Sequence, residues 1–354
     1  MSTKSFLVVA SLALSVLLGL VLRRGGEQGG AATPEAGSNQ LVIGLSMDTL
    51  KEARWAKDRD AFVARAKELG AEVKVLSANS DDNRQVADVT TLLTAGVKAV
   101  VIVPHDGKAM AKGVELAHAA DVPVVAYDRL IMDSDLDLYV TFDNRKVGEL
   151  QAQYVLDTLK DAPKPIKIVR VYGSKTDANA FSFKQGQDDV LLLAIAAGQV
   201  EVLHEDWADD WKPENAKRIM NAAITKHGGA IQAVVASNDG TAGGAIQAMK
   251  EVGTMGQVIV TGQDAELVAV QRIVGGEQSM TIYKPVQNLA RRAAEVAVAL
   301  AKGKPVVAQG ESDNGKIKVP SIFHDVITVT KANVDSTVIA DGFHLREEVY
   351  GKAQ

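Results

Sequence analysis

The sequence contains no cysteine among its 354 residues. This absence excludes disulfides, thiolate nucleophiles, iron–sulfur clusters and cysteine-ligated zinc, and it also excludes the lipid-bearing cysteine of a bacterial lipoprotein. Aromatic residues make up only 5% of the chain, so the positions at which they occur are informative. The net charge of −5 provides no basic field that would attract nucleic acid or anionic lipid. We therefore expect no nucleic-acid partner.

The common motifs of enzyme active sites are also missing. No G-x-G-x-x-G follows an expected strand, and no Gly-Lys pair is followed by the Ser or Thr of a phosphate-binding loop. There is no G-x-S-x-G nucleophile elbow. His204-Glu205 lacks the second histidine of a zinc-binding H-E-x-x-H motif. The sequence therefore favours a binding protein over an enzyme, and it predicts no cofactor and no metal.

One long apolar run stands near the N-terminus, at residues 6–22, and only two serines and one glycine interrupt it. Its length lies between that of a signal-peptide core and that of a membrane span. Residues 25–40 are rich in Gly, Ala and Ser, a composition typical of a flexible tether. We interpret residues 1–40 as either a cleaved export signal or a retained N-terminal anchor. Both alternatives place the folded part outside the cytoplasm, with membrane contact only through this segment.

From residue 41 onward, short β-branched runs alternate with helical patterns. Strands are expected at 41–47, 72–78, 99–104, 123–128 and 138–143, then at 166–172, 200–204, 233–237, 258–262 and 280–283. Helices are expected at 53–69, 84–95, 107–120, 180–195, 213–225, 240–252, 265–274 and 287–302. The spacing leaves room for one crossover helix between successive strands, which predicts parallel sheets. Several strands are apolar on both faces, as expected where helices cover both sides. We therefore predict an α/β fold with two doubly wound, Rossmann-like lobes.

Polar and indole side chains gather at the expected carboxyl ends of these strands, where open α/β sheets bind ligands. They are Asp48, Arg54, Trp55, Asp128 and Arg129 in the first half, and Asp177, Asn179, Trp211, Asn238, Asp239, Gln263, Asp264 and Lys284 in the second. A sugar hydroxyl both donates and accepts hydrogen bonds, so it is matched by carboxylates or amides together with cations. Indole rings pack well on the apolar C–H faces of a sugar. This mixture favours a neutral sugar over a phosphate or an amino acid.

Several of these residues also have a purely structural interpretation. Asn238 and Asp264 precede expected helices, and both residue types are good N-caps. Asp128 and Arg129 can form an ion pair that closes a loop. Trp55 lies on the apolar face of its helix and can be a core residue. Lys284 can be a surface residue of a hinge. The common position of these residues at one sheet edge favours the binding interpretation.

Seven segments of the sequence form a recognisable series: RWxxDRD at residues 54–60, AYDR at 126–129, FDNRKVGELQA at 142–152, WADDWKPENA at 207–216, VVASNDGTAGGAIQA at 234–248, GQDAEL at 262–267 and MTIYKP at 280–285. The series resembles the periplasmic D-xylose-binding members of the pentose/hexose solute-binding proteins of ABC transporters. The resemblance extends in the same order from about residue 43 to residue 343. It implies a type I periplasmic binding fold, in which three segments form a hinge between two lobes.

The resemblance also implies a site and a role. The implied sugar-binding residues are Arg54, Trp55, Asp128, Arg129, Asn179, Trp211, Asn238, Asp264 and Lys284, with the two tryptophans stacked on the ring; the role of Asp177 stays open. The implied lobes are residues 41–143 plus 284–320 and residues 144–283 plus 321–354, with the sugar in the cleft between them. The expected protein is a periplasmic monomer that captures D-xylose or a close aldose and delivers it to an ABC permease. The alternative is a binding protein that presents the sugar to a membrane chemoreceptor or sensor kinase.

Overall fold

The structure is a computed structural model that describes residues 40–255 and 258–351. The expected signal or anchor at residues 1–40 lies outside the described residues, apart from Gln40. Residues 41–354 form a compact unit of their own, and the following description concerns this unit. Among the described residues, no helix is both long enough and apolar enough to cross a membrane.

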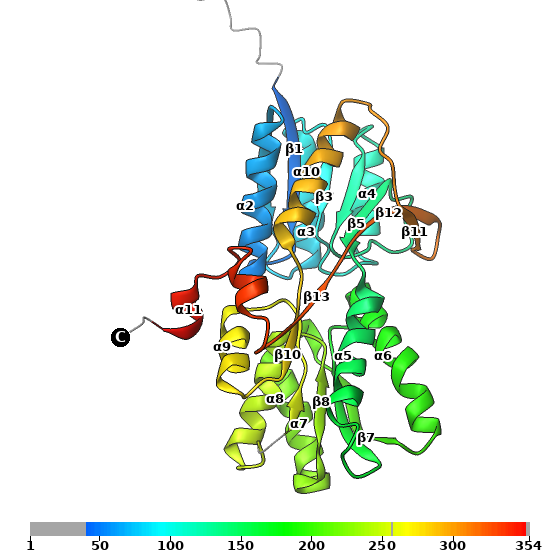
Figure 1. Ribbon diagram of the computed structural model, residues 1–354. Helices are drawn as coiled ribbons and strands as arrows, with labels where there is room; N and C mark the ends of the chain where they lie inside the picture. Colours follow the sequence, from blue (N-terminus) through cyan, green and yellow to red (C-terminus); the bar gives the residue numbers. More distant parts are fainter. Residues whose placement is uncertain (1–39, 256–257, 352–354) are drawn as a thin grey trace, which may run out of the picture. The chain divides into compact units, whose positions relative to one another are not determined.

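The first lobe is built on a sheet with the strand order β11-β12-β5-β4-β3-β1-β2 (Figure 1). Its neighbouring strands are parallel except for the antiparallel pair β11–β12. The strands are β1 Leu41–Met47, β2 Ala71–Ser77, β3 Val100–Ile102, β4 Val124–Tyr127, β5 Leu138–Phe142, β11 Gly310–Asp313 and β12 Lys318–His324. The helices are α2 Ala53–Glu68, α3 Asp82–Thr94, α4 Ala111–His118 and α10 Val286–Ala301.

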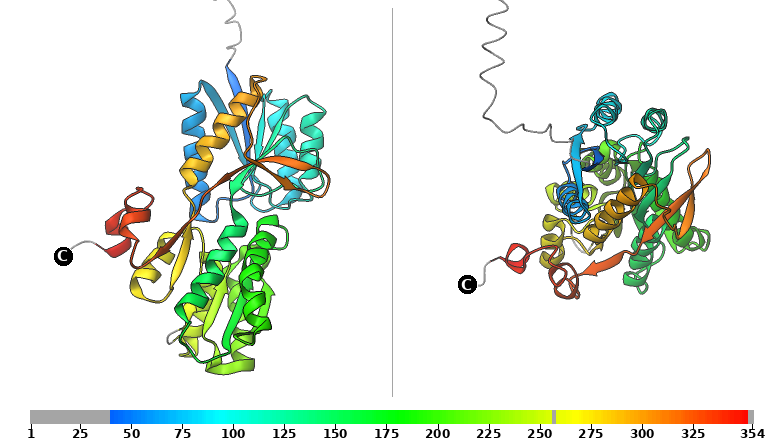
Figure 2. Two further views of the ribbon diagram at one scale, coloured as in Figure 1. Left: turned by 45° about the vertical axis from the view of Figure 1, so that its right-hand side comes forward. Right: turned by 90° about the horizontal axis from the view of Figure 1, so that it is seen from above.

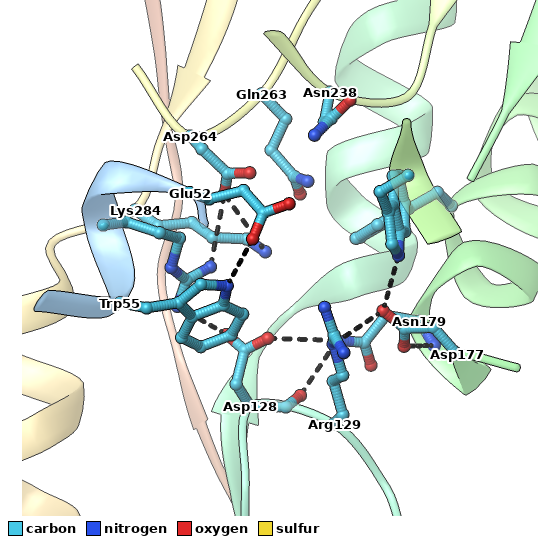
Figure 3. A pocket seen from close by; sticks show the side chains of 13 residues that line it. Glu52, Trp55, Asp128, Arg129, Asp177, Asn179, Asn238, Gln263, Asp264 and Lys284 are labelled. Carbon is cyan, nitrogen blue, oxygen red and sulfur yellow. Dashed lines mark hydrogen bonds and ion pairs between the residues drawn. The ribbon is translucent and has the colours of Figure 1, made fainter. Parts of the chain in front are cut away.

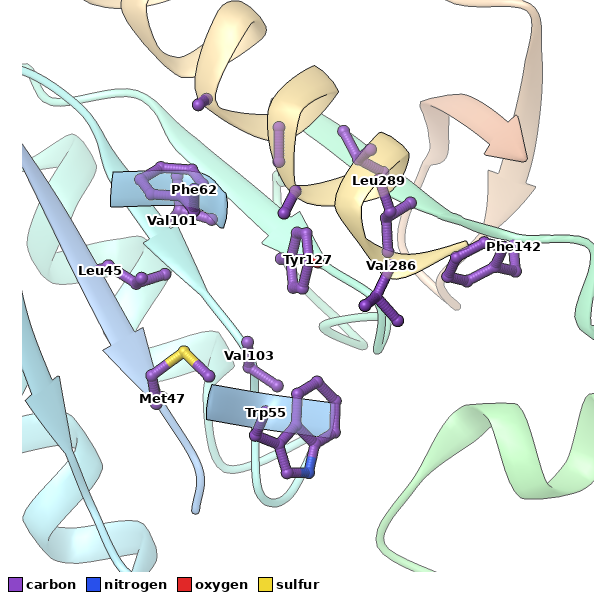
Figure 4. Packing of buried hydrophobic residues seen from close by; sticks show 14 of the residues in the cluster. Leu45, Met47, Trp55, Phe62, Val101, Val103, Tyr127, Phe142, Val286 and Leu289 are labelled. Atoms are coloured by element: carbon purple, nitrogen blue, oxygen red, sulfur yellow. The ribbon is translucent and has the colours of Figure 1, made fainter. Parts of the chain in front are cut away.

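Alternation along the strands divides the core of the first lobe into two layers. Val101 and Tyr127 pack with α2 and α10 on one face of the sheet (Figure 4). Their strand neighbours Val100 and Ile102 pack with α3 and α4 on the other face. Successive side chains of a strand point to opposite faces, so a strand covered by helices on both sides must be apolar throughout. This explains why these strands read as continuous apolar runs.

The second lobe repeats the design on a parallel sheet with the strand order β7-β6-β8-β9. Helices α5 and α6 pack on one face, and helices α7 and α8 pack on the other (Figure 2). The strands are β6 Ile166–Tyr172, β7 Val200–Trp207, β8 Ala233–Ala236 and β9 Ile259–Val260. The helices are α5 Asn144–Thr158, α6 Ala178–Ala196, α7 Pro213–His227, α8 Asp239–Glu251 and α9 Leu267–Gly275. The predicted α/β class and its parallel sheets are confirmed.

In the described part of the chain, three connections join the lobes. The first lies at Asp143, between β5 and α5, and the second at Lys284-Pro285, between β10 (Met280–Tyr283) and α10. The third lies between β12 and β13 (Ile327–Thr330), which pairs antiparallel with β10. This last connection differs from the crossing expected near Pro320, because residues 321–324 continue to pair with β5 in the first sheet. Beyond β13 the chain forms a helical turn, Asp335–Ile339, and a short helix, α11 Arg346–Tyr350.

Candidate functional site

The nine side chains expected to bind sugar all line one cavity between the two lobes (Figure 3). The wall also contains four residues outside that set: Glu52, Asp177, Phe183 and Gln263. The cavity lies at the carboxyl ends of both parallel sheets, because each contributing loop follows a strand or opens a helix.

Arg54 forms the charged centre of the cavity. It lies in the first turn of α2, and its guanidinium group contacts Asp128 at 2.8 Å and Asp264 at 3.2 Å. It also contacts Asp58, one helical turn further on, at 3.3 Å. Asp128 directly follows β4 in the first lobe, whereas Asp264 belongs to the second lobe. The buried Arg54 side chain therefore joins three carboxylates and links the two lobes.

Burial and charge act against each other in this cluster. Burial alone lowers the pKa of Arg54, but the neighbouring carboxylates hold it well above its ordinary value. Burial alone raises the pKa of Asp128, but Arg54 and Lys284 hold it below its usual value. For Asp58, burial dominates and the pKa is raised. The Tyr127 hydroxyl donates a hydrogen bond to this carboxylate.

Arg129 makes the second link between the lobes. Its guanidinium group contacts Asp48 of the first lobe at 2.7 Å and Asp177 of the second lobe at 3.0 Å. Asp177 also accepts a hydrogen bond from the Trp211 indole at 3.2 Å, and its other oxygen accepts one from the backbone N–H of Asn179 at 2.9 Å. Burial raises the pKa of Asp177, although Arg129 opposes this effect. The structure therefore places Asp177 as the acceptor that orients both Arg129 and Trp211.

The two tryptophans lie at different parts of the wall. Trp55 packs in the core of the first lobe, which confirms the core interpretation, and it also lines the cavity. Its indole donates a hydrogen bond to Glu52 at 3.0 Å. Trp211 adopts a left-handed backbone with φ of 57°, which is unusual for so large a residue. Its ring lies against Gly173, where a β-carbon would overlap the indole. Glycine is therefore required at this approach.

The two asparagines are held by the protein itself. Asn179 donates to the carbonyl of Asp128 at 2.9 Å, and its side-chain oxygen accepts from Tyr139 and Asn144. Asn238 caps α8, because its side-chain oxygen accepts from the backbone N–H of Thr241 at 2.9 Å. The cap interpretation of Asn238 is therefore confirmed, and the residue also lines the cavity.

Two structural interpretations from the sequence are wrong. Asp264 does not cap α9, because Glu266 occupies the N-cap position and Asp264 pairs with Arg54 instead. Lys284 is not a surface residue of the hinge, because it is only 2% exposed and its ammonium group lies 3.8 Å from Asp264. Burial lowers the pKa of Lys284, while Asp128 and Asp264 oppose this effect.

Sequence reasoning did not include three wall residues in its predicted site. Gln263 stands directly before Asp264 and was placed at the same strand end by the sequence, but the family resemblance did not include it among the sugar-binding residues. Its side-chain oxygen is buried and has no hydrogen-bond partner among the described residues, which leaves an acceptor available in the wall. Phe183 belongs to the middle of α6, and Glu52 precedes α2. Neither carries a local pattern that distinguishes it from other helix residues.

This arrangement suits a neutral, hydroxyl-rich ligand. Cations, carboxylates and amides surround the cavity in a balanced set, so each hydroxyl meets donors as well as acceptors. The indole and phenyl rings add apolar area for C–H groups. Within the described ranges, no group of three or more His, Cys, Asp or Glu side chains could hold a metal ion.

Two α/β lobes, three connections and a cavity between the lobes together define a two-lobed solute-binding protein. The chain belongs to the periplasmic binding protein family, because residues 43–305 match the model of the periplasmic binding protein domain. It is 46% identical over 316 residues to the D-xylose-binding periplasmic protein of Haemophilus influenzae, an alignment that covers 89% of this chain and 94% of that protein. It is 43% identical over 314 residues to the D-xylose-binding periplasmic protein of Escherichia coli, with the same coverage of 89% and 94%.

Among solved structures, the fold matches a carbohydrate transporter solute-binding protein from Chloroflexus aurantiacus in complex with D-glucose. The TM-score is 0.82 at 34% sequence identity, and the match covers 88% of this chain and 98% of that one. The resemblance detected in the sequence motifs is therefore confirmed.

Proposed function

We propose that this protein is a periplasmic solute-binding protein that captures D-xylose, or a close aldose, and delivers it to an ABC sugar transporter. The observation that carries the proposal is the convergence of nine side chains of sugar-binding character on one cavity. The relatives named as D-xylose-binding proteins favour a pentose over other sugars. In this proposal the protein binds its ligand and releases it unchanged.

The proposed contacts follow from the chemistry of each side chain. Asp128 and Asp264 accept hydrogen bonds from sugar hydroxyls, and the guanidinium groups of Arg54 and Arg129 donate. Asn179 and Asn238 contribute amide groups, and Lys284 donates from the connection between β10 and α10. Trp55 and Trp211 pack on the ring. Because the two lobes both contribute, the site is complete only when they close on the ligand.

The proposed lobe division follows the connections. The first lobe comprises residues 41–143 and 284–320, extended to 324 by the pairing of β12 with β5. The second lobe comprises residues 144–283 together with β13 and the segment that follows it. In lobe closure the connections then absorb the backbone rotation while each sheet moves as a rigid body, and the ion pairs of Arg54 with Asp264 and of Arg129 with Asp177 form between the lobes.

A thermal-shift screen of monosaccharides tests the proposal. The protein is first unfolded and refolded to remove any carried ligand, and it is then scanned with D-xylose, L-arabinose, D-ribose, D-glucose and D-galactose, with xylitol as an acyclic control. A ligand at about 100 times its dissociation constant adds roughly 2.7 kcal/mol of stability, which is a shift of several degrees. We expect the largest rise in melting temperature with D-xylose. After incubation with the protein, the NMR spectrum should show the sugar unchanged. A flat response to every sugar would refute the proposal.

A further inference from the structure

The turn that carries Asp264 has an unfavourable backbone. Asp264 and Ala265 are consecutive non-glycine residues with φ values of 93° and 50°. Side chains with a β-carbon disfavour this region because the β-carbon crowds the backbone. Such a conformation persists only where the surrounding structure holds it. The contacts of this turn therefore decide where the Asp264 carboxylate lies.

Three of these contacts come from the second lobe itself. The N–H of Asp264 donates to the carbonyl of Ile282 at 2.7 Å, and the N–H of Ala265 donates to the Thr281 hydroxyl at 3.2 Å. The next N–H, of Glu266, donates to the buried carboxylate of Asp239 at 2.9 Å. Residues of strand β10 and helix α8 thus accept hydrogen bonds from the three backbone N–H groups of the turn.

The fourth contact comes from a different part of the chain. The Nε2 atom of His344 lies 2.7 Å from the carbonyl oxygen of Ala265. A carbonyl oxygen can only accept, so Nε2 carries the hydrogen and donates it. The His344 side chain is 7% exposed, so water does not readily replace this donor. We call residues 331–351, which contain His344, the C-terminal strap.

The strap is itself anchored on the helix that carries Arg54 and Trp55. The ammonium group of Lys57 on α2 donates to the Phe343 carbonyl and lies 3.8 Å from the centre of the Phe343 ring. Phe343 packs edge-on against the His344 ring, with 4.6 Å between ring centres. At its other end the strap accepts a hydrogen bond from Gln271 of α9 at the Glu348 carbonyl. Figures 1 and 2 show this last segment beside α9.

We infer that the C-terminal strap positions the ligand-binding turn, and that His344 is the positioning residue, because its hydrogen bond to Ala265 holds Asp264 in the orientation that meets the ligand. This inference rests on the proposed function, since it assigns Asp264 to sugar recognition. Through Lys57, the strap also fixes this turn relative to Arg54. Removing the His344 hydrogen bond is therefore expected to change the position of the Asp264 carboxylate and not the fold as a whole.

The test measures D-xylose affinity by calorimetry for the full chain and its variants. His344→Ala is expected to weaken binding about 3- to 10-fold, as for the loss of one buried hydrogen bond. His344→Phe keeps the ring packing but has no hydrogen-bond donor, so it should lose a similar amount of affinity. This variant replaces the alanine variant in the test if that variant folds poorly. His344→Gln retains a donor and should recover much of the affinity. Arg346→Ala, an exposed change in the same strap, should bind as the wild type does.

A double-mutant cycle separates positioning from general support. In an Asp264→Asn background, His344→Phe should have little further effect on affinity, because His344 acts through Asp264. If His344→Phe lowers the affinity equally in the wild-type and Asp264→Asn backgrounds, the inference is overturned. Amide hydrogen exchange of residues 263–266, measured without sugar, should accelerate in His344→Phe and not in Arg346→Ala. Unchanged exchange would also overturn it. If the wild type binds no monosaccharide, the proposed function fails, and the exchange rates still decide whether the strap holds the turn.

Discussion

Replacing Arg54 with methionine should destabilise the protein strongly at neutral pH. The guanidinium group is 4% exposed and neutralises Asp58, Asp128 and Asp264, two of which are themselves almost fully buried. Removing one partner of a buried ion pair leaves uncompensated charge and typically costs about 3–5 kcal/mol. For a chain of this size we expect a fall in melting temperature of roughly 4–7 °C.

The stability lost in Arg54→Met should depend on pH, and the direction of the dependence follows from the pKa values of the carboxylates. Burial already raises the pKa of Asp58, and without Arg54 it must rise further. The pKa of Asp128, which Arg54 helps to hold below its usual value, must rise as well. The folded variant then binds protons at a pH where the unfolded chain, with carboxyl pKa values near about 3.9, does not. A state that binds more protons is favoured as the pH falls. The difference in unfolding free energy between wild type and Arg54→Met should therefore be largest at pH 7 and shrink toward pH 4.5.

The measurement is denaturant unfolding of the sugar-free protein at both pH values. Arg59→Met is the matched control, since Arg59 lies on the same helix, is partly exposed and pairs only with the adjacent, exposed Asp60 among the described residues. The control should lose less than about 1 kcal/mol. If Arg54→Met is as stable as wild type at pH 7, or loses the same free energy at both pH values, the assigned role of Arg54 as the counter-charge of these carboxylates is wrong.

Two further predictions concern the ligand. Asp264→Ala should bind D-xylose about 30- to 1,000-fold more weakly, because sugar hydroxyls left unpaired on burial cost about 2–4 kcal/mol. Small-angle scattering should show that sugar compacts the wild type but not the variant. Wild-type affinity in the variant would contradict the assigned contact. Gly173→Ala should displace the Trp211 ring that lies against it and weaken binding about 5- to 150-fold, from an overpacking cost of roughly 1–3 kcal/mol. Unchanged affinity together with unchanged tryptophan fluorescence would show that the ring tolerates the added methyl group.

The strand and helix pattern of both lobes could be predicted from the sequence because its signals are local. Apolar runs of strand length, separated by helical periodicity, predict β1 and β6 with the bounds that the structure has. The strand-end rule then placed a larger set of candidate residues at the carboxyl edges of the sheets, because parallel strands present their carboxyl ends together. The family resemblance implied which nine of them bind sugar. Helix α5 and the strands after residue 305 were not predicted. Of these later strands, β12 and β13 pair with the distant strands β5 and β10, so their own residues carry little of the signal.

The detailed geometry of the candidate site was decided only by the tertiary structure. Arg54 and Asp264 are 210 positions apart, and no local pattern indicates that they pair. The same holds for Asp177, which meets Arg129 and Trp211, and for Lys284, whose burial depends on elements of both lobes. Local periodicity reports which residues can face a core or a sheet edge, because it depends on the repeat of one helix or strand. The choice of partner depends on how separate elements pack, and so the ion pairs, the strained turn at Asp264 and its contact with His344 emerge only when the chain is folded.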